Sequence, residues 1–365
     1  MKKLRKIVTA LAAVLFALVA LFHLSTYHPK AVQGERIYTR DGSALPSGQS
    51  GGPILKKGQT IKVLNWNLQY MAGKNYVFFY DEWDGSGKDT RPSREDIEAT
   101  YKEVVRILLA EDPDVLVLQE LHDGSASTDK EKQLERLVAM LPADYAYYTS
   151  AFYWKAAFVP HPRIMGSAGM KLAIISKYRI EEAIRYQLPL MPADPITRQL
   201  NFKRAVLEAR LPVEGGSALS LMSIHMDAFA QGSDIMQKQV DYVLGLLDKT
   251  AEEGRTFAIA GDFNLVPPGA SYSRLPDDEK PMFQPDTEIA RLYERFKGYP
   301  RVEDVDGPEG NAFLTHFPNI RSAPDRVLDY YFVSDDIVPA SFYVRQHDTL
   351  RISDHLPTIL EFSLP

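Results

Sequence analysis

Hydrophobic and polar positions alternate along this chain in short segments, most of which predict β-strands. The predicted strands are 61–68 (IKVLNWNL), 112–120 (DPDVLVLQE), 171–176, 204–211, 219–226, 257–261, 329–334 and 358–364. Apolar residues recur at helical spacing in two further stretches, 97–109 and 236–247, and Ser93 with Asp96 predicts a cap before the first. Because several strands follow one another without a helix, the pattern favours two sheets packed face to face, with helices outside, over a doubly wound sheet.

The N-terminus combines a basic flank with a long apolar run. Residues 1–6 (MKKLRK) carry four positive charges, and residues 7–24 contain no Lys, Arg, Asp or Glu. A run of about 18 residues is at the lower limit for crossing a bilayer. No small-residue cleavage site follows it, so we favour an uncleaved transmembrane signal anchor over a cleaved signal peptide.

The positive-inside rule then places the basic flank in the cytoplasm and the rest of the chain on the extracytoplasmic side of the inner (cell) membrane, as a single-pass protein. Cleavage would instead give a secreted or periplasmic protein. Residues 1–24 are thus predicted to be the flank and anchor, and 25–60 a tether, because 39–53 is rich in Gly, Ser and Pro. Residues 61–365 are predicted to form one domain.

Composition changes this picture only slightly. The net charge of −6 is a mild argument against a broad groove that follows the phosphates of a nucleic acid. The chain has no cysteine, which excludes disulfides, zinc–thiolate sites and cysteine nucleophiles.

Polar residues stand repeatedly at the ends of the predicted strands. They are Asn67, Glu120, His225, Asp262, Asn264, Asp329, Asp354 and His355. Each by itself has a structural explanation, such as a turn cap, a solvated strand end or a packed histidine. One edge of a two-sheet sandwich would collect all of them, and the set therefore predicts an active site.

The order of these segments resembles the endonuclease/exonuclease/phosphatase superfamily, which includes pancreatic deoxyribonuclease and bacterial sphingomyelinases, over about residues 60–365. The matching stretches are NWNLQ, DVLVLQE, LAIISK, SIHMD, AGDFN, LDYYFVS and SDHLP, in the family order. The resemblance implies a deoxyribonuclease-like four-layer α/β sandwich, in which two packed mixed β-sheets are flanked by helices and the site lies at one open edge. It also implies a metal-dependent phosphoric ester hydrolase that uses Mg²⁺ or Mn²⁺.

The same resemblance assigns the metal-binding residues. Glu120 is the matched metal ligand, and carboxylate with water is what Mg²⁺ prefers. Asp354 is expected to help hold this ion or a second one. Asn67 is expected beside the metal, where its amide would hold the phosphate or a neighbouring carboxylate.

The catalytic residues follow from the resemblance in the same way. His355 matches the catalytic histidine, and Asp329 matches the carboxylate that orients its ring. Asp262 would align or deprotonate the attacking water, and Asn264 would bind the phosphate or a carboxylate through its amide. His225 would donate to a non-bridging oxygen in the transition state. Whether Asp262 or His355 takes the proton is left open by the sequence.

The substrate is suggested by two aromatic-rich stretches that do not match the family, 76–83 and 145–162. They fit core packing, a surface at the level of lipid headgroups, or stacking on nucleic-acid bases. The anchor and the acidic net charge favour a phosphodiester of a lipid, with an extracytoplasmic nuclease as the alternative. A catalytically inactive sandwich used as a binding module is a third interpretation, which the filled motif positions disfavour. Lys171 and Arg204 are further candidates for phosphate contact, and no protein partner is inferable.

Overall fold

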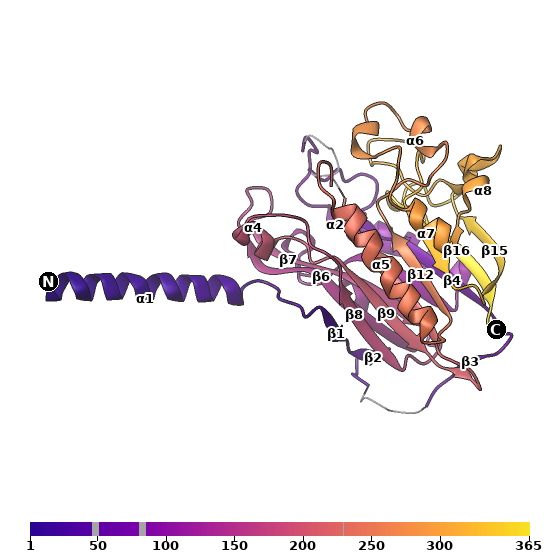
Figure 1. The fold of residues 1–365 in the computed structure, drawn as a ribbon, viewed down its shortest axis with the longest axis horizontal. Helices are drawn as coiled ribbons and strands as arrows, with labels where there is room; N and C mark the ends of the chain where they lie inside the picture. Colours follow the sequence, from indigo (N-terminus) through magenta and orange to yellow (C-terminus); the bar gives the residue numbers. More distant parts are fainter. Residues whose placement is uncertain (46–50, 80–84, 229) are drawn as a thin grey trace.

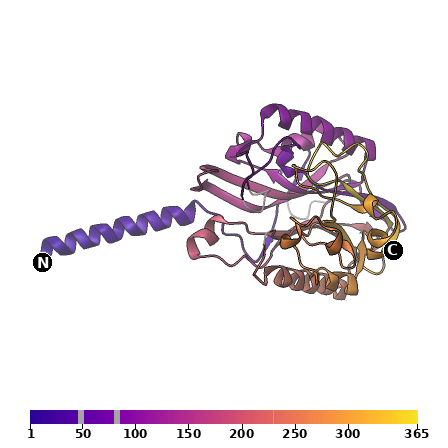
Figure 2. The same cartoon turned by 90° about the horizontal axis from the view of Figure 1, so that it is seen from above.

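Two seven-stranded β-sheets pack against each other and are covered by helices on their outer faces (Figures 1 and 2). The computed structural model describes residues 1–45, 51–79, 85–228 and 230–365. The first sheet has the order β15-β16-β4-β5-β7-β6-β2, with β2 Ile37–Thr39, β4 Thr60–Asn67, β5 Val115–His122, β6 Tyr147–Val159, β7 Gly166–Ser176, β15 Val338–Val344 and β16 Thr358–Ser363. The second has the order β1-β8-β9-β11-β12-β14-β13, with β1 Val32–Gly34, β8 Glu182–Gln187, β9 Ala205–Leu211, β11 Leu219–His225, β12 Phe257–Asp262, β13 Lys297–Tyr299 and β14 Asp329–Val333.

Helices lie on both outer faces of this sandwich, which Figure 2 shows with α2 on one side and α5 on the other. The α-helices are α1 Lys2–Leu24, α2 Arg94–Glu111, α3 Gln133–Met140, α4 Pro195–Leu200, α5 Ile235–Glu252, α6 Ser271–Arg274, α7 Ala290–Arg295 and α8 Val302–Asp306. Short 3-10 turns are η1 Gln69–Met71, η2 Ala126–Thr128, η3 Lys280–Met282 and η4 Gly310–Phe313. Both sheets are mixed: β4 and β5 run parallel, as do β11 and β12, whereas β5 and β7 run antiparallel. The predicted four-layer α/β sandwich is therefore confirmed.

Alternation along the central strands produces the layers. Val117 of β5 packs in the cluster between the sheets, whereas its neighbours Leu116 and Leu118 pack in the cluster that includes residues of α2. Successive side chains of a strand point to opposite faces, so a strand covered on both sides must be apolar throughout. This is why the sequence is continuously hydrophobic from Val115 to Leu118. The predicted cap of α2 also forms, because the Ser93 hydroxyl accepts a hydrogen bond from the backbone N–H of Asp96 at 3.0 Å.

Three short strands lie within 25–60, the segment expected to be a tether. β1 pairs with β8, β2 pairs with β6, and β3 (Leu55–Lys56) pairs with β10 (Val213–Glu214). Strands of two or three residues are too short to show a period of their own, and their partners lie far away in the sequence. Residues 46–50 of the Gly-, Ser- and Pro-rich stretch, and 80–83 of the first aromatic stretch, lie outside the described residues.

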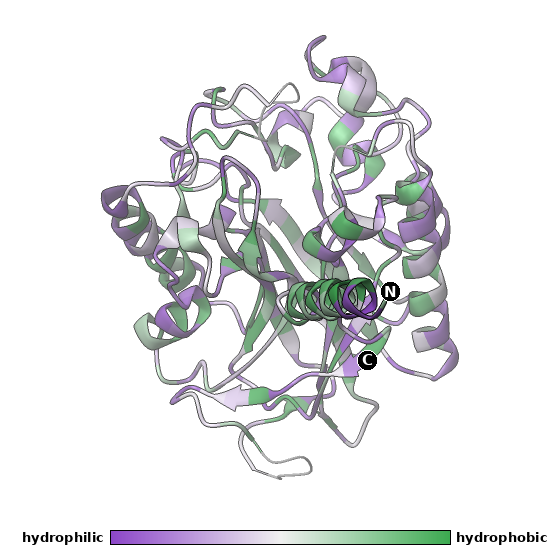
Figure 3. Ribbon diagram, turned by 90° about the vertical axis from the view of Figure 1, so that its left-hand side faces the viewer, coloured by the Kyte–Doolittle hydropathy of each residue, from purple (hydrophilic) through white to green (hydrophobic). Residues whose placement is uncertain are grey.

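The N-terminal apolar run forms α1, which extends away from the sheets (Figures 1 and 2). None of its residues, all of which are described, is buried, and most of its ribbon has the colour of hydrophobic residues (Figure 3). By length and composition α1 is long and apolar enough to cross a membrane, and a signal sequence would have the same properties.

Candidate active site

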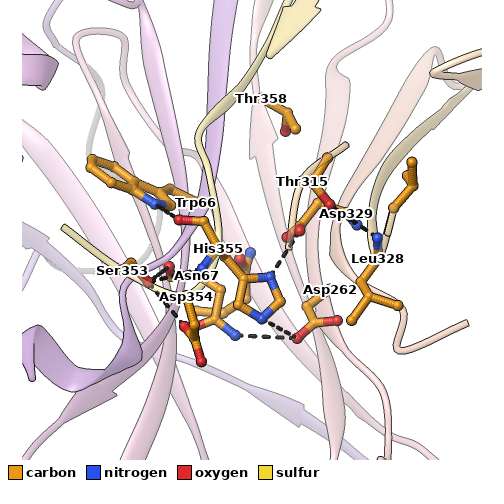
Figure 4. Close-up of polar contacts among 12 residues, drawn as sticks. Trp66, Asn67, Asp262, Thr315, Leu328, Asp329, Ser353, Asp354, His355 and Thr358 are labelled. Carbon is orange, nitrogen blue, oxygen red and sulfur yellow. Dashed lines mark hydrogen bonds and ion pairs between the residues drawn. The ribbon is translucent and has the colours of Figure 1, made fainter. Parts of the chain in front are cut away.

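Predicted polar residues from both sheets lie together at one edge, and Figure 4 shows five of them: Asn67, Asp262, Asp329, Asp354 and His355. β4, β5, β11 and β12 place Asn67, Glu120, His225 and Asp262 at or near their C-terminal ends. β14 runs antiparallel to β12, so its first residue, Asp329, pairs directly with Asp262. The remaining predicted residues come from loops that follow β12 and precede β16.

His355 and Asp329 form the shortest contact of the site. His355 Nδ1 lies 2.8 Å from Asp329 Oδ2, and both side chains are buried. The indole N–H of Trp66 donates to the His355 carbonyl at 2.9 Å, which holds the backbone behind the ring. Burial opposes protonation of His355, but the carboxylates of Asp329 and Asp262 outweigh it and raise the pKa of His355 to about 10. The ring is therefore held as an imidazolium between two acids.

Asp262 is the centre of the cluster. Its Oδ2 lies 3.5 Å from His355 Nε2, 3.3 Å from His225 Nε2 and 3.2 Å from Asn67 Nδ2. Its Oδ1 accepts a hydrogen bond from the backbone N–H of Asn264 at 3.0 Å. Burial raises the pKa of Asp262 to about 6, although the charge of His355 acts in the opposite direction. A carboxylate with this pKa can exchange a proton near neutral pH.

Asn67 joins Asp262 to Glu120. Its amide nitrogen also donates to Glu120 Oε1 at 3.2 Å, while its amide oxygen accepts from the backbone N–H of Gln69 at 3.1 Å. In this arrangement Asn67 supports the two carboxylates by hydrogen bonds. For its amide oxygen to contact a metal beside these carboxylates, the side-chain amide would have to rotate so that oxygen and nitrogen exchange places.

Glu120 sits at an irregularity of β5. The pairing of β5 with β7 shifts register between Leu118 and Leu121, and Glu120 has a φ of 59°, in the left-handed region. A bulge of this kind re-aims a side chain, here toward the site. Burial and the nearby carboxylate of Asp354 raise the pKa of Glu120 to about 7. Two carboxylates that disfavour each other's charge form a donor set that fits a hard divalent cation.

Two predicted residues support the cluster from its sides. His225 Nδ1 lies 3.4 Å from the hydroxyl of Tyr153, and burial with the charge of Arg204 holds the pKa of His225 well below its usual value. The Asn264 amide nitrogen donates to the carbonyl of Met226 at 3.2 Å, which ties the loop after β12 to the end of β11. His225 is thus a neutral ring, and Asn264 presents its backbone N–H to the site.

His316 belongs to the same cluster, although sequence reasoning assigned it no role. Nitrogen or oxygen atoms of His316, Asp354 and His355 all lie within 4.8 Å of one another. The His316 and His355 rings meet edge to face with centroids 4.5 Å apart, and His316 Nδ1 has no hydrogen-bond partner among the described residues. The stretch around His316 matches no motif, so only its backbone pairing with His355 reveals its place.

Arg204 is one of the two cations that the sequence offers as candidates for phosphate contact. It is 7% exposed, and its Nε lies 3.4 Å from Asp227 Oδ1. Its Nη1 is buried without a hydrogen-bond partner in the described part of the chain. Lys171, the other cation considered, pairs with Asp123. Arg204 therefore keeps one unpaired N–H donor, and its charge acts on His225. The ammonium of Lys171 is already paired with Asp123.

A model of the Endonuclease/Exonuclease/phosphatase family matches residues 64–355. No curated protein sequence matches the chain. Among solved structures, an endonuclease/exonuclease/phosphatase from Beutenbergia cavernae is 19% identical with a TM-score of 0.57, over 84% of this chain and 72% of that one.

Two further structures are similar to this chain. The human Nocturnin catalytic domain with bound sulfate is 17% identical, with a TM-score of 0.51 over 85% of this chain and 95% of that one. TDP2 of D. rerio, complexed with a single-strand DNA product, is 17% identical, with a TM-score of 0.50 over 84% of this chain and 99% of that one. At these identities the likeness shows the shared fold.

Proposed function

The chain belongs to the endonuclease/exonuclease/phosphatase family, whose members are typically metal-dependent hydrolases, and on this premise we propose that it hydrolyses a phosphodiester. The observation that carries the proposal is the convergence of Glu120, Asp262 and His355 from three separate elements, with Asn67 bonded to two of them. All the motif positions are filled, which argues against an inactive binding module.

A divalent ion, Mg²⁺ or Mn²⁺, is proposed to be held by Glu120 and Asp354. When bound, it would polarise the phosphoryl group and stabilise the leaving oxygen. Asp262 is proposed to take a proton from the attacking water, because His355 lies between Asp262 and Asp329 and is held as a cation. As a cation, His355 would donate to the phosphate from Nε2. Because the protonated His355 ring has no free nitrogen to accept a proton, Asp262 is the group proposed to act as the base.

The phosphate itself needs donors that face inward. We propose that the unpartnered Nη1 of Arg204, whose charge acts on His225, is one of these donors. Charge-assisted hydrogen bonds from guanidinium to phosphate are among the stronger polar contacts in proteins. We propose that Arg204 and His225 bind the non-bridging oxygens, with Asn264 at the edge of the same pocket.

The substrate is proposed to be a lipid phosphodiester at the surface of the membrane. α1 is proposed to remain as an anchor, with its basic flank in the cytoplasm and the sheets on the extracytoplasmic side. Support comes from the absence of a clean cleavage site in the sequence and from the residues after α1, since the carbonyl of Ser25 already accepts a bond from Ala157 of β6 at 2.8 Å. Nucleic acid is the second candidate, because the similar TDP2 structure holds a DNA product.

The test is a substrate panel on the full chain in detergent micelles. Phospholipids, sphingomyelin, inositol phosphates, single-stranded DNA and bis(p-nitrophenyl) phosphate are each offered with Mg²⁺ and with EDTA. We expect metal-dependent cleavage of a phosphodiester that is lost in Asp262→Asn and retained in Asp335→Asn, an exposed aspartate just beyond the far end of β14. Cleavage that persists in EDTA and in Asp262→Asn would refute the proposal.

A further inference from the structure

The end of α1 is fastened to the same end of the sandwich that carries the site. Thr26 forms a backbone bridge with Ala156 of β6, and its hydroxyl lies 3.3 Å from the Gln199 side-chain oxygen of α4. Figure 1 shows α1 joining the sheets on the side where α4, β6 and β7 lie. The chain therefore leaves α1 between the β6–β7 hairpin and α4.

The distance from this junction to the site follows from the strand register. Ala156 pairs with Ala168 of β7, and Lys171 of the same strand pairs with Leu121, the neighbour of Glu120. Lys171 comes three residues after Ala168, which corresponds to about 10 Å along the strand, and β6 lies two strand spacings of about 4.8 Å from β5. The β5 backbone next to Glu120 thus lies roughly 14 Å from Ala156, the residue that Thr26 contacts.

Large apolar side chains project from the elements around this junction. Phe158 near the end of β6 is 46% exposed, Met165 at the hairpin turn is 60% exposed, and Ile196 of α4 is 64% exposed. Their neighbours Val159 and Ile164 pack with Leu200 of α4, so the hairpin and α4 form one unit. We call Phe158, Met165 and Ile196 the rim. Exposed apolar residues that project from one such unit beside a membrane-type helix are typical of an interaction surface.

The sequence segments that carry the rim have a positive net charge, in contrast with the chain as a whole. Residues 145–180 and 195–207 contain no Asp or Glu, whereas the whole chain has a net charge of −6. Lys155, Arg163 and Arg198 are exposed near the rim. Apolar side chains flanked by basic ones match the interface of a bilayer with anionic headgroups.

Aromatic rings connect the rim to the site. Trp154 is half-buried, donates its indole N–H to the carbonyl of Leu200 at 2.8 Å, and lies 4.8 Å from the Phe202 ring. Tyr153 follows, 6.2 Å from Phe202 and 5.4 Å from the His225 ring. A series of packed rings therefore links the hairpin next to the rim with His225.

We infer that the rim lies in the headgroup layer of the bilayer that holds α1, so that a phosphodiester headgroup enters the site directly from the membrane surface. This inference rests on the proposed function, because it takes α1 as an anchor and the site as a phosphodiesterase. The partner of the rim is the lipid surface, because α1 ends beside the rim and the flanking charges are basic. Lys171, which pairs with the neighbour of Glu120, is only three residues further along β7 than the partner of Ala156.

The position of the rim is tested without any activity. The chain has no cysteine, so Phe158→Cys, Met165→Cys and Ile196→Cys can each carry a single environment-sensitive fluorophore in the full chain. Val338→Cys is the matched control, because Val338 is 65% exposed and pairs with Ser363, which pairs with Thr60 at the far end of β4 from Asn67. The protein is reconstituted into vesicles of equimolar phosphatidylcholine and phosphatidylglycerol.

We expect blue-shifted emission at the three rim positions, and quenching there by lipids with a nitroxide near the headgroup. The control label should stay in water. Rim labels that behave like the control would overturn the inference, whatever the enzyme hydrolyses.

The role of the rim in lipid delivery needs a second measurement. Phe158→Ser, Met165→Ser and Ile196→Ser together should slow hydrolysis of vesicle phospholipid by about tenfold or more, because interfacial binding scales with buried apolar area. Hydrolysis of bis(p-nitrophenyl) phosphate and the melting temperature should remain as in the unmodified chain. Equal losses on both substrates would contradict lipid delivery. A chain that cleaves no phosphodiester with Mg²⁺ would instead refute the proposed function, while the labels still report the rim.

Discussion

Replacing Asp329 by Asn should slow hydrolysis by acting through His355. The Asp329 carboxylate accepts from His355 Nδ1 at 2.8 Å, and both groups are buried. Asparagine keeps the shape of the side chain but removes its charge. The backbone here is held independently, because the N–H groups of Leu328 and Asp329 both donate to the hydroxyl of Thr315.

The size of the effect follows from the kind of bond that is lost. A hydrogen bond to a charged group contributes about 1.5–3 kcal/mol, and this corresponds to roughly a ten- to hundredfold loss in rate. Removing the ring itself in His355→Ala should cost more, on the order of a hundred- to ten-thousandfold, as for a general acid–base group. In the double variant, Asp329→Asn has no ring left to orient, so the loss should equal that of His355→Ala alone.

The assay is the initial rate of bis(p-nitrophenyl) phosphate hydrolysis by the full chain at saturating Mg²⁺, with kcat and KM determined separately. The loss in Asp329→Asn should appear in kcat, whereas KM should change little, because the pair acts on the transition state. Asp335→Asn serves as the control, and melting temperatures show that the fold is retained. If the two single losses multiply in the double variant, His355 and Asp329 act independently and our reasoning about the pair is wrong.

Four further results are expected. Glu120→Gln should lower turnover by on the order of a hundredfold or more, with partial rescue at high Mg²⁺; full activity in excess EDTA would disprove this. Arg204→Gln should raise KM for a phosphodiester by roughly tenfold, and Arg204→Lys by less; an unchanged KM in Arg204→Gln would exclude the phosphate contact. Mass spectrometry of the native protein should find residues 7–24 retained, and a mature start after residue 24 would rule out the anchor. Trp154→Ala should lower the free energy of unfolding by less than the roughly 3–5 kcal/mol of a fully buried ring, and should reduce activity on vesicles more than on a soluble substrate; equal losses with a lower melting temperature would make Trp154 a core residue.

The order of strands and loops and the family motifs could be predicted from the sequence, because each depends on residues that are close together along the chain. The run from Val115 to Leu118 is apolar throughout because both faces of β5 are covered, and a reader of the sequence can recognise this without knowing what covers them. The predicted site residues stand at strand ends for a similar reason, since the ends of parallel neighbours open on the same edge of a sheet. The order of these motifs along the chain then suffices to indicate the fold.

Other features depend on contacts between distant segments. The sequence offers Arg204 only as one of two candidate cations and gives His316 no role. Packing alone shows that Arg204 keeps an unpaired donor and that the His316 ring contacts His355. The aromatic stretch 145–162 looks uniform in sequence, yet Tyr153 is buried beside His225 whereas Phe158 is exposed at the end of the strand.

The sequence by itself thus predicted the packed layers, because hydrophobic periodicity records for each segment which face meets the core. The resemblance of its motifs to a known family predicted the open edge and most of the polar groups there. Only the tertiary structure decided which groups touch, which donors stay unpaired, and that the end of α1 meets the edge carrying the site. Those outcomes depend on the register between strands such as β6 and β7, and register is settled by the packing of the whole sandwich.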